Sequence, residues 1–471
     1  MEKLEKLSEG ATKAWVLALV SVASFMVFLD AMVVTTALST IRADLDASIE
    51  ALEWTVNAYN LTFAVLLLTG AALGDRLGRR RMFAAGLALF IVASAACGLA
   101  GSAGWLIAAR ALQGAGAALS MPLAMMLLSA AFPAEQRAKA LGLFSSIIGL
   151  ALIAGPAVGG AITQGLAWQW IFWINIPIGL VVIPLVLSRI AESYGPRAPL
   201  DIGGIALAAG AALGVVWGLM RANNAGWTSV EVVAALVIGL VLAVAFVAWE
   251  MRARAPMIPM RLFRSRAYSS GIAASFLFYA SMYGVLFLLP QFLQVAQGHD
   301  PLGTGLRLLT WTATLFVFAP IGGALVNRIG ERPLVVGGVF LQAIGFAWIA
   351  AIAAPDLAYG RLVAPLILAG TGVSMAMPAA QNAILGAVAA SEVGKASGTF
   401  NMLRFLGAVF GIAVMVAMFA RNGSVDSPQA FSAGFVPAMG VSAGLSFLAT
   451  IVGLWLPGRR EVALLPASSK A

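Results

Sequence analysis

One aspartate, Asp30, lies deep in an apolar run of the sequence, FMVFLDAMVV. An unpaired carboxylate in hydrocarbon costs several kcal/mol, so its side chain is expected to face a protein interior or a water-filled cavity. A carboxyl group in such a place can bind a proton and release it again when its surroundings change. A structural carboxylate that pairs with a neighbouring helix is the alternative. Asp30 is the leading candidate for proton coupling.

Arg110, in the stretch AARALQGAG, is a second charged residue inside an apolar run. Asp30 is in the first run and Arg110 in the fourth, so the two runs would cross a membrane in opposite directions. Both residues would then lie at a similar depth. We hypothesise that they interact, directly or through water, and that protonation of Asp30 weakens the link. The alternative is that Arg110 bonds only to backbone carbonyls.

A charged turn with glycines separates the second and third apolar runs, LGDRLGRRR at residues 73–81. Its candidates for a gating role are Asp75, Arg76, Gly78 and Arg79. A carboxylate here can face a helix N-terminus in the other half of the chain, where the helix dipole favours negative charge, and so hold an inner gate shut. A turn that carries only topology-setting positive charge is the alternative, but it does not explain the glycines.

The fifth apolar run contains the sequence GPAVGG, in which Gly155 and Pro156 are further candidates for a conformational role. Glycines on one face of a helix permit close approach of a neighbour, and proline bends a helix. A general packing role and a role in setting transport direction are equally open.

Polar and aromatic residues within the runs are candidates to line a substrate cavity, because such side chains suit an adaptable apolar pocket with a few polar contacts. Packing is the alternative for each of them. Arg404 needs a partner or an anionic ligand if it is buried. Glu53 is expected at the outer interface in contact with solvent, with a place in the cavity as the alternative. The set is Glu53, Tyr59, Gln113, Tyr279, Tyr283, Gln291, Gln381, Asn401 and Arg404.

The composition indicates which kind of structural element holds these residues in place. The 471 residues are 61% hydrophobic and 10% charged, with a mean hydropathy of +0.94, whereas soluble proteins carry about 25% charged residues. The apolar residues fall in about fourteen runs of roughly the 20 residues that cross a bilayer, and strand-type alternation is absent. We predict an all-α integral membrane protein with spans near 14–36, 52–72, 82–101, 105–128, 138–162, 168–189, 201–220, 230–249, 270–294, 303–326, 333–353, 361–388, 396–420 and 434–456.

The placement of charge predicts the topology. The net charge is +9, from 29 Lys and Arg against 20 Asp and Glu. About 22 of the basic residues fall in the termini and the even-numbered loops, which is the positive-inside pattern and predicts cytoplasmic termini. The basic charge therefore does not indicate nucleic-acid binding. The first run is interpreted as a retained span, because it exceeds the apolar core of a signal peptide. The lone Cys97 and lone His299 give no support to a disulfide, a metal site or an enzyme nucleophile.

The charged turn has a degraded copy, LVNRIGERP at residues 325–333, in which Asn327 takes the place of Asp75. The two positions are 327 − 75 = 252 residues apart. Six spans of about 30 residues would separate the copies by only about 180–200 residues, so the excess predicts one additional helical hairpin. The predicted layout is a six-helix bundle at 1–190, an inserted hairpin with its linkers at 191–268, and a second six-helix bundle at 269–471.

These motifs resemble those of the major facilitator superfamily, whose pattern matches LGDRLGRRR, RALQGAGAA at 110–118 and the GP-x-x-GG run. The fourteen runs, LDAMVVTTAL at 29–38 and WQWIFWINIPIG at 168–179 are similar to its fourteen-span drug/proton antiporter family. The family's first-span pattern Leu-Asp-x-Thr-x-x-Asn is altered at Met32 and Thr35, and the proline that follows it is replaced by Ser39. Ala71 and Ala151 stand where the family has glycine.

The resemblance implies proton-coupled export of small molecules by alternating access, through a multi-pass protein of the bacterial cytoplasmic membrane. The expected partners are lipid, protons and the substrate, with no cofactor, no metal and a monomeric chain. Acidic residues deep in the apolar runs are scarce, and this scarcity favours monovalent cationic, neutral or amphipathic substrates. No Gly-x-x-x-x-Gly-Lys-Ser/Thr loop is present, so ATP is not the expected energy source. The alternatives are a narrow metabolite or antibiotic exporter, an uptake system, and a non-transporting membrane scaffold.

Overall fold

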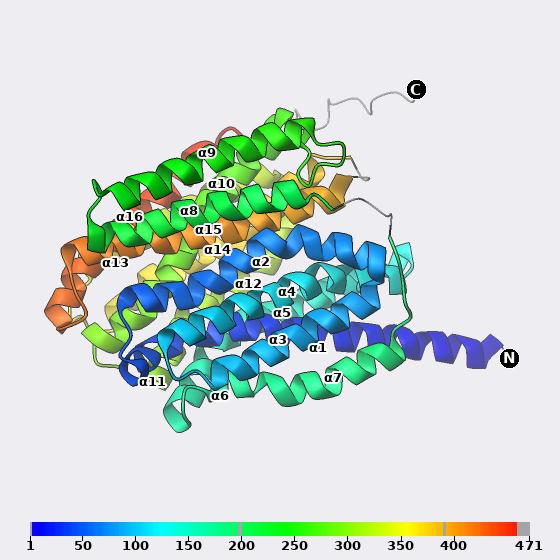
Figure 1. Cartoon of the computed structure of the whole chain (residues 1–471), viewed down its shortest axis with the longest axis horizontal. Helices are drawn as coiled ribbons and strands as arrows, with labels where there is room; N and C mark the ends of the chain where they lie inside the picture. The colour runs from blue at the N-terminus through cyan, green and yellow to red at the C-terminus, as the bar shows by residue number, and fades with distance from the viewer. Residues whose placement is uncertain (1, 196–199, 390–391, 459–471) are drawn as a thin grey trace. The chain divides into compact units, whose positions relative to one another are not determined.

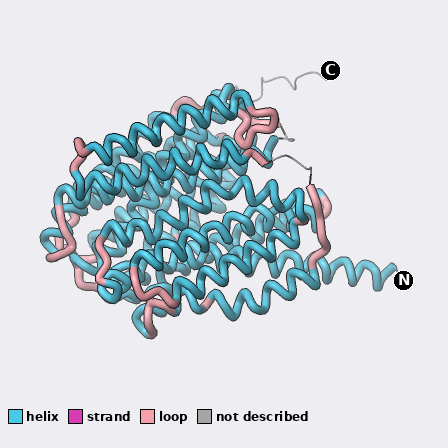
Figure 2. The backbone as a smooth tube through the Cα atoms, viewed as in Figure 1, coloured by secondary structure: helices cyan, strands magenta, loops and turns pink. Residues whose placement is uncertain are grey.

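The computed structural model describes residues 2–195, 200–389 and 392–458, and the regular structure in these ranges is helical throughout (Figures 1 and 2). Fourteen of its segments are long and apolar enough to cross a membrane, which confirms the predicted number of spans. The helices are α1 Glu2–Leu45, α2 Ile49–Leu77, α3 Arg79–Gly98, α4 Ala103–Ala131, α5 Ala134–Gly165, α6 Trp170–Trp173, α7 Asn175–Arg189, α8 Ile202–Ala225, α9 Val230–Arg252, η1 Met260–Arg264, α10 Arg266–Gln291, η2 Phe292–Ala296, α11 Pro301–Thr312, α12 Thr314–Ile329, α13 Glu331–Ile352, α14 Gly360–Gly386, α15 Val393–Asn422 and α16 Pro428–Gly453.

Short polar signals set several helix ends. The side chains of Ser48, Ser102, Ser265 and Ser427 accept hydrogen bonds from backbone N–H groups in the first turns of α2, α4, α10 and α16. Gly78 separates α2 from α3 with φ +110°, and Gly330 separates α12 from α13 with φ +87°. Few residues other than glycine adopt such angles without strain. The two glycines are 330 − 78 = 252 residues apart, so both copies of the turn keep the same backbone conformation class.

Four spans differ from the predicted straight runs. The first helix continues to Leu45 instead of ending near residue 36. The sixth span is divided into α6 and α7, and the tenth into α11 and α12. The ninth span ends in the π-helical turn η2, directly after Pro290 in the last turn of α10. Hydropathy identifies the apolar run but not the backbone hydrogen bonds within it, so these breaks were not predicted.

The chain forms two compact units. The N-terminal unit comprises Met1–Leu213, Gly239–Met257 and His299–Leu306, and the C-terminal unit comprises Gly214–Ile238, Ile258–Gly298 and Arg307–Ala471. Within the N-terminal unit α1 packs against α5 and α7, α2 against α4, and α3 against α4 and α7. Within the C-terminal unit α10 packs against α15 and α16, α12 against α14, and α13 against α14 and α16. The same pairing of six spans therefore occurs in both units. The predicted boundaries at residues 190 and 268 stay a prediction.

Helices α8 and α9 are the additional hairpin, and they lie side by side (Figure 1). Glycines of α8 provide room for large side chains of α9, because a Cβ at Gly203 would meet Trp249 and one at Gly218 would meet Leu236. The indole N–H of Trp249 donates to Asp201 Oδ1 at 2.7 Å, which fixes one end of the hairpin. The residues of this hairpin are divided between the two units.

Candidate functional site

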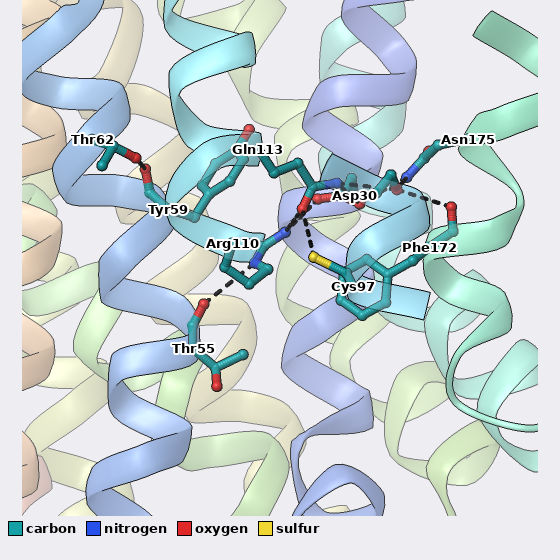
Figure 3. A network of polar contacts seen from close by, with 10 residues as sticks. Asp30, Thr55, Tyr59, Thr62, Cys97, Arg110, Gln113, Phe172 and Asn175 are labelled. Atoms are coloured by element: carbon teal, nitrogen blue, oxygen red, sulfur yellow. Dashed lines mark hydrogen bonds and ion pairs between the residues drawn. The ribbon is translucent and has the colours of Figure 1, made fainter. Parts of the chain in front are cut away.

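Asp30 of α1 and Arg110 of α4 form an ion pair inside the N-terminal unit (Figure 3). Asp30 Oδ2 lies 2.6 Å from Arg110 Nη1, and each residue is 1% exposed. Two charges withdrawn from water are stable together only when their geometry is good and their remaining polar atoms are hydrogen-bonded. The neighbouring side chains supply those bonds.

Two amide side chains complete the binding of the Asp30 carboxylate. Its Oδ1 accepts hydrogen bonds from Gln113 Nε2 at 2.9 Å and from Asn175 Nδ2 at 2.8 Å. Gln113 lies on α4, one turn after Arg110, and Asn175 is the first residue of α7. Three helices thus converge on one carboxylate (Figure 3).

Ser94 of α3 orients both amides. Its hydroxyl accepts hydrogen bonds from Gln113 Nε2 at 3.2 Å and Asn175 Nδ2 at 2.9 Å, and donates to the carbonyl of Phe172 at 2.9 Å. Each amide nitrogen therefore gives one hydrogen to Asp30 and one to Ser94. This arrangement leaves the amides no alternative orientation that keeps the same bonds.

Arg110 is held from several sides. Its Nη1 also donates to Gln113 Oε1 at 2.6 Å, and its Nε donates to the backbone carbonyl of Thr55 at 3.3 Å. The guanidinium carbon lies 4.3 Å from the ring centroid of Tyr59, within the range of a cation–π contact. The network therefore links α1, α2, α3, α4 and α7.

The charged turn forms its own cluster at the end of α2. Asp75 Oδ1 lies 2.7 Å from Arg79 Nη2, and Gly78 between them carries the positive φ. Arg76 is exposed. The predicted contact of Asp75 with a helix N-terminus in the other half stays a prediction. The side chain of Asn327, its counterpart in the second copy, lies outside what the structure describes.

The segment that follows α7 binds this turn, which the sequence did not predict. Glu192 Oε1 accepts from the backbone N–H of Arg80 at 2.8 Å, and Glu192 Oε2 from that of Arg81 at 3.3 Å. A carboxylate at this place accepts hydrogen bonds from N–H groups that have no partner within helix α3. It is also stabilised by the positive end of the helix dipole. The backbone of Gly195 also donates to the carbonyl of Asp75 at 3.0 Å. The linker after the sixth span is thereby fixed to the turn.

Two of the glycine-run candidates pack tightly within the N-terminal unit. A Cβ at Gly155 or Gly159 would strike α1, and a Cβ at Gly305 in α11 would strike the backbone of Pro156. The close helix approach expected from the glycine spacing is therefore present. Its role in setting transport direction stays a prediction.

A second buried arginine lies in the C-terminal unit. The guanidinium carbon of Arg404 in α15 is 4.6 Å from the ring centroid of Tyr279 in α10. The ring of Tyr283 lies one turn further along α10, 6.4 Å from that of Tyr279. All three side chains are buried. Sequence reasoning placed these residues in one set, and the structure brings them into contact.

Comparison with known proteins identifies the family. The family model described as the Major Facilitator Superfamily matches residues 20–249, 202–412 and 271–471. The chain belongs to this superfamily. It is 35% identical over 398 residues to the multidrug resistance protein Stp of Mycobacterium tuberculosis, covering 84% of this chain and 74% of that one. It is 34% identical to the tetracenomycin C resistance and export protein of Streptomyces glaucescens, covering 89% of this chain and 78% of that one.

Solved structures agree on the fold of this transporter. A peptide transporter of the POT family in complex with sulfate superposes with a TM-score of 0.68 at 17% identity, covering 93% of each chain. At this sequence identity the similarity shows a shared fold and does not show a shared substrate. The major facilitator fold and its drug-efflux relatives are those that the motifs predicted, and the superfamily consists of transporters, not enzymes.

The structure refines the expected coupling site of the transporter. The predicted contact between Asp30 and Arg110 is direct. Gln113, a cavity candidate, bonds to both of them, and its contact with substrate stays a prediction. Asn175 and Ser94 were missed, although the polar Asn175 stands out in the apolar stretch WINIPIG. The lone Cys97 is buried beside this network, with Sγ 3.7 Å from Gln113 Oε1.

The expectation for Glu53 was wrong. Its side chain is 1% exposed instead of solvated, because α2 begins at Ile49 and places Glu53 more than a turn inside the helix. Its Oε1 accepts a hydrogen bond from Asn57 Nδ2 at 3.4 Å, one turn further along. The alternative, that Glu53 lines the cavity, stays a prediction.

Two of the three remaining cavity candidates form a hydrogen bond within their own helix. Gln291 Nε2 donates to the carbonyl of Phe287 at 2.8 Å, and Asn401 Nδ2 to that of Ser397 at 2.9 Å, each within its own helix. Gln381 is partly buried. Within the described part of the chain, no contact of these three amides distinguishes them as substrate ligands, so their role stays a prediction. Among the described residues, no group of three His, Cys, Asp or Glu side chains is placed to hold a metal ion.

Proposed function

We propose that this transporter exports amphipathic, drug-like compounds from the cytoplasm in exchange for protons. The observation that carries the proposal is the buried Asp30 carboxylate bound by Arg110, Gln113 and Asn175. The names of its relatives, a multidrug resistance protein and an antibiotic resistance and export protein, support the outward direction. In this proposal the protein spans the bacterial cytoplasmic membrane with both termini in the cytoplasm, works as a monomer and needs no cofactor.

The coupling step follows from the charges of the network. The ionised carboxylate holds Arg110 through the ion pair and draws the amides of Gln113 and Asn175 towards Oδ1. A proton on Asp30 removes that charge and weakens the attraction of α1 for α4 and α7. Proton binding and helix packing are thereby linked, which is what alternating access requires. The proton gradient supplies about 1.4 kcal/mol per pH unit, and net charge movement about 2.3 kcal/mol per 100 mV.

The test is drug transport in proteoliposomes with an imposed pH gradient, with a panel of cationic and neutral dyes. Asp30→Asn keeps the size of the side chain but cannot lose a proton, so gradient-driven flux is expected to fall by at least about tenfold, the effect of about 1.4 kcal/mol. Asp46→Asn is the matched control, since Asp46 is exposed just beyond α1. If Asp30→Asn retains drug-driven proton release, Asp30 is not the coupling group, and the scaffold alternative predicts no flux for any compound.

A narrow antibiotic exporter is the second candidate. It is favoured by the relative named for tetracenomycin C resistance and export. The same proteoliposomes distinguish the two functions. Broad export predicts gradient-driven flux for several unrelated dyes, whereas a narrow exporter predicts flux for one chemical class.

A further inference from the structure

Arg404 is a buried cation that lacks a carboxylate partner in the part of the chain that the structure describes. The residue is 8% exposed, and its Nε has no hydrogen-bond partner there. The ion pairs found among the described residues do not include it. Burying a guanidinium without a counter-charge is costly. A ligand that supplies the negative charge would remove this cost.

Aromatic rings surround the guanidinium. Its central carbon is 4.6 Å from the ring centroid of Tyr279 and 5.5 Å from that of Phe405. The ring of Phe400 lies 6.2 Å from Tyr279, and that of Tyr283 lies 6.4 Å from Phe405. A ring under a guanidinium occupies its flat face and leaves the N–H groups at its edge to form hydrogen bonds. In Arg404 one such bond is made with Tyr283, and Nε has no partner among the described residues.

Arg110 in the other unit shows what such an arrangement binds. Its guanidinium lies 4.3 Å from the ring centroid of Tyr59, close to the 4.6 Å between Arg404 and Tyr279. The N–H groups of Arg110 bind the carboxylate of Asp30. Both arginines therefore rest on a tyrosine ring, but the described part of the chain supplies a carboxylate to only one of them.

We propose that Arg404, with Tyr279, Tyr283, Phe400 and Phe405, binds the anionic group of an aromatic substrate, a carboxylate or a phenolate. The guanidinium forms charge-assisted hydrogen bonds to the planar anion, and the rings stack on the aromatic body of the compound. The proposal rests on the proposed export function and names a substrate class for it. It adds acidic aromatic compounds to the cationic and neutral substrates expected from the sequence.

A matched pair of probes tests the site. 2-Naphthoate and 2-naphthamide share one aromatic body and differ in charge. Their affinities for the full chain are measured by tryptophan fluorescence in nanodiscs of phosphatidylcholine. The unmodified protein is expected to bind 2-naphthoate at least tenfold more tightly than 2-naphthamide. Equal affinities would overturn the proposal, even if variants of Arg404 do not fold.

Variants assign the preference to the residue. Arg404→Gln is expected to bring the two affinities within twofold of each other, and Arg404→Lys to keep part of the difference. Arg421→Gln is the matched control, because Arg421 is exposed on the last turn of the same helix and should keep the full preference. An undiminished preference in Arg404→Gln would contradict the assignment.

Two further measurements are needed. The first distinguishes a bound substrate from a bound lipid, and the second distinguishes anion binding from transport. Discs that also contain phosphatidylglycerol test a lipid headgroup, and displacement of 2-naphthoate by this lipid would overturn the assignment to substrate. Asp30→Asn is expected to keep the naphthoate preference while it loses gradient-driven transport. If the preference is absent but gradient-driven flux remains, the anion site fails and the export function stands.

Discussion

A single nitrogen of Arg110 donates to two acceptors, so replacing the guanidinium by another cation would disturb both hydrogen bonds. Nη1 donates to Asp30 Oδ2 and to Gln113 Oε1, each at 2.6 Å, while Nε reaches the carbonyl of Thr55 at 3.3 Å. These bonds require the planar fork of a guanidinium, which also lies on the ring of Tyr59. A lysine ammonium keeps the charge but has neither the fork nor the flat face.

We therefore expect Arg110→Lys to reduce gradient-driven transport by about tenfold or more, the effect of about 1.4 kcal/mol in the coupling step. Transport is measured in proteoliposomes, and thermal unfolding shows whether the variant is folded. The matched control is Arg421→Lys, at an exposed position. Normal transport by a folded Arg110→Lys protein would show that positive charge alone is sufficient.

The sequence predicted the charged pair of this site and named Gln113 as a cavity candidate, but it missed Ser94 and Asn175. Asp30 and Arg110 are conspicuous because charges are rare in apolar runs, and the antiparallel order of their spans placed them at one depth. Ser94 and Asn175 belong to residue types that also occur where they do nothing more than pack or bond to their own helix. Their role depends on contacts between α3, α4 and α7, and no pattern within one helix records such contacts.

At the scale of the helices, the two copies share their packing but differ in charge. In the C-terminal unit α10, α13 and α16 meet through Ser281, Gln342 and Ser446, where Gln342 Nε2 donates to both hydroxyls at 3.1 Å. The corresponding helices α1, α3 and α7 of the N-terminal unit meet at Asn175, whose Nδ2 donates to Asp30 of α1 and to Ser94 of α3. The repeat therefore provides a polar junction in each unit, and only the first junction carries a carboxylate. This asymmetry agrees with the proposal that Asp30, in the N-terminal unit, is the coupling group.

The glycines of α5 provide a test of helix packing with an internal control. A Cβ at Gly159 would lie 2.6 Å from the carbonyl oxygen of Val33, whereas nothing lies within 4 Å of a Cβ at Gly149. We expect Gly159→Ala to destabilise the protein by about 1–3 kcal/mol, because α1 must move away. Gly149→Ala should be neutral or stabilise the helix by up to about 1 kcal/mol.

Thermal unfolding of the purified protein, measured in the same detergent for both variants, gives the comparison. The unfolding midpoint of Gly159→Ala should be lower than that of Gly149→Ala. A reversed order would mean that α1 and α5 do not make this close contact in the membrane protein.

At the scale of the whole molecule, the sequence predicted the number of spans and the fold more completely than it predicted the breaks within single spans. The fourteen spans could be predicted because the apolar runs have the length of a bilayer crossing, and the family motifs named the fold. The breaks within the sixth and tenth spans could not be predicted, since hydropathy does not report where backbone hydrogen bonds are interrupted within a run. Orientation depends on the loops, where positive charge is concentrated on one predicted side.

Cysteine labelling tests the orientation, and the chain is well suited to it. Its one cysteine, Cys97, is buried, so the unmodified protein should give little signal with a membrane-impermeant maleimide. Arg254→Cys lies in the exposed, basic connection after α9 and should react only after the cells are lysed. Asp356→Cys lies in the exposed connection between α13 and α14 and should react in intact cells. Labelling of Arg254→Cys in intact cells would contradict the predicted cytoplasmic location of both termini, and with it the proposed outward direction of transport.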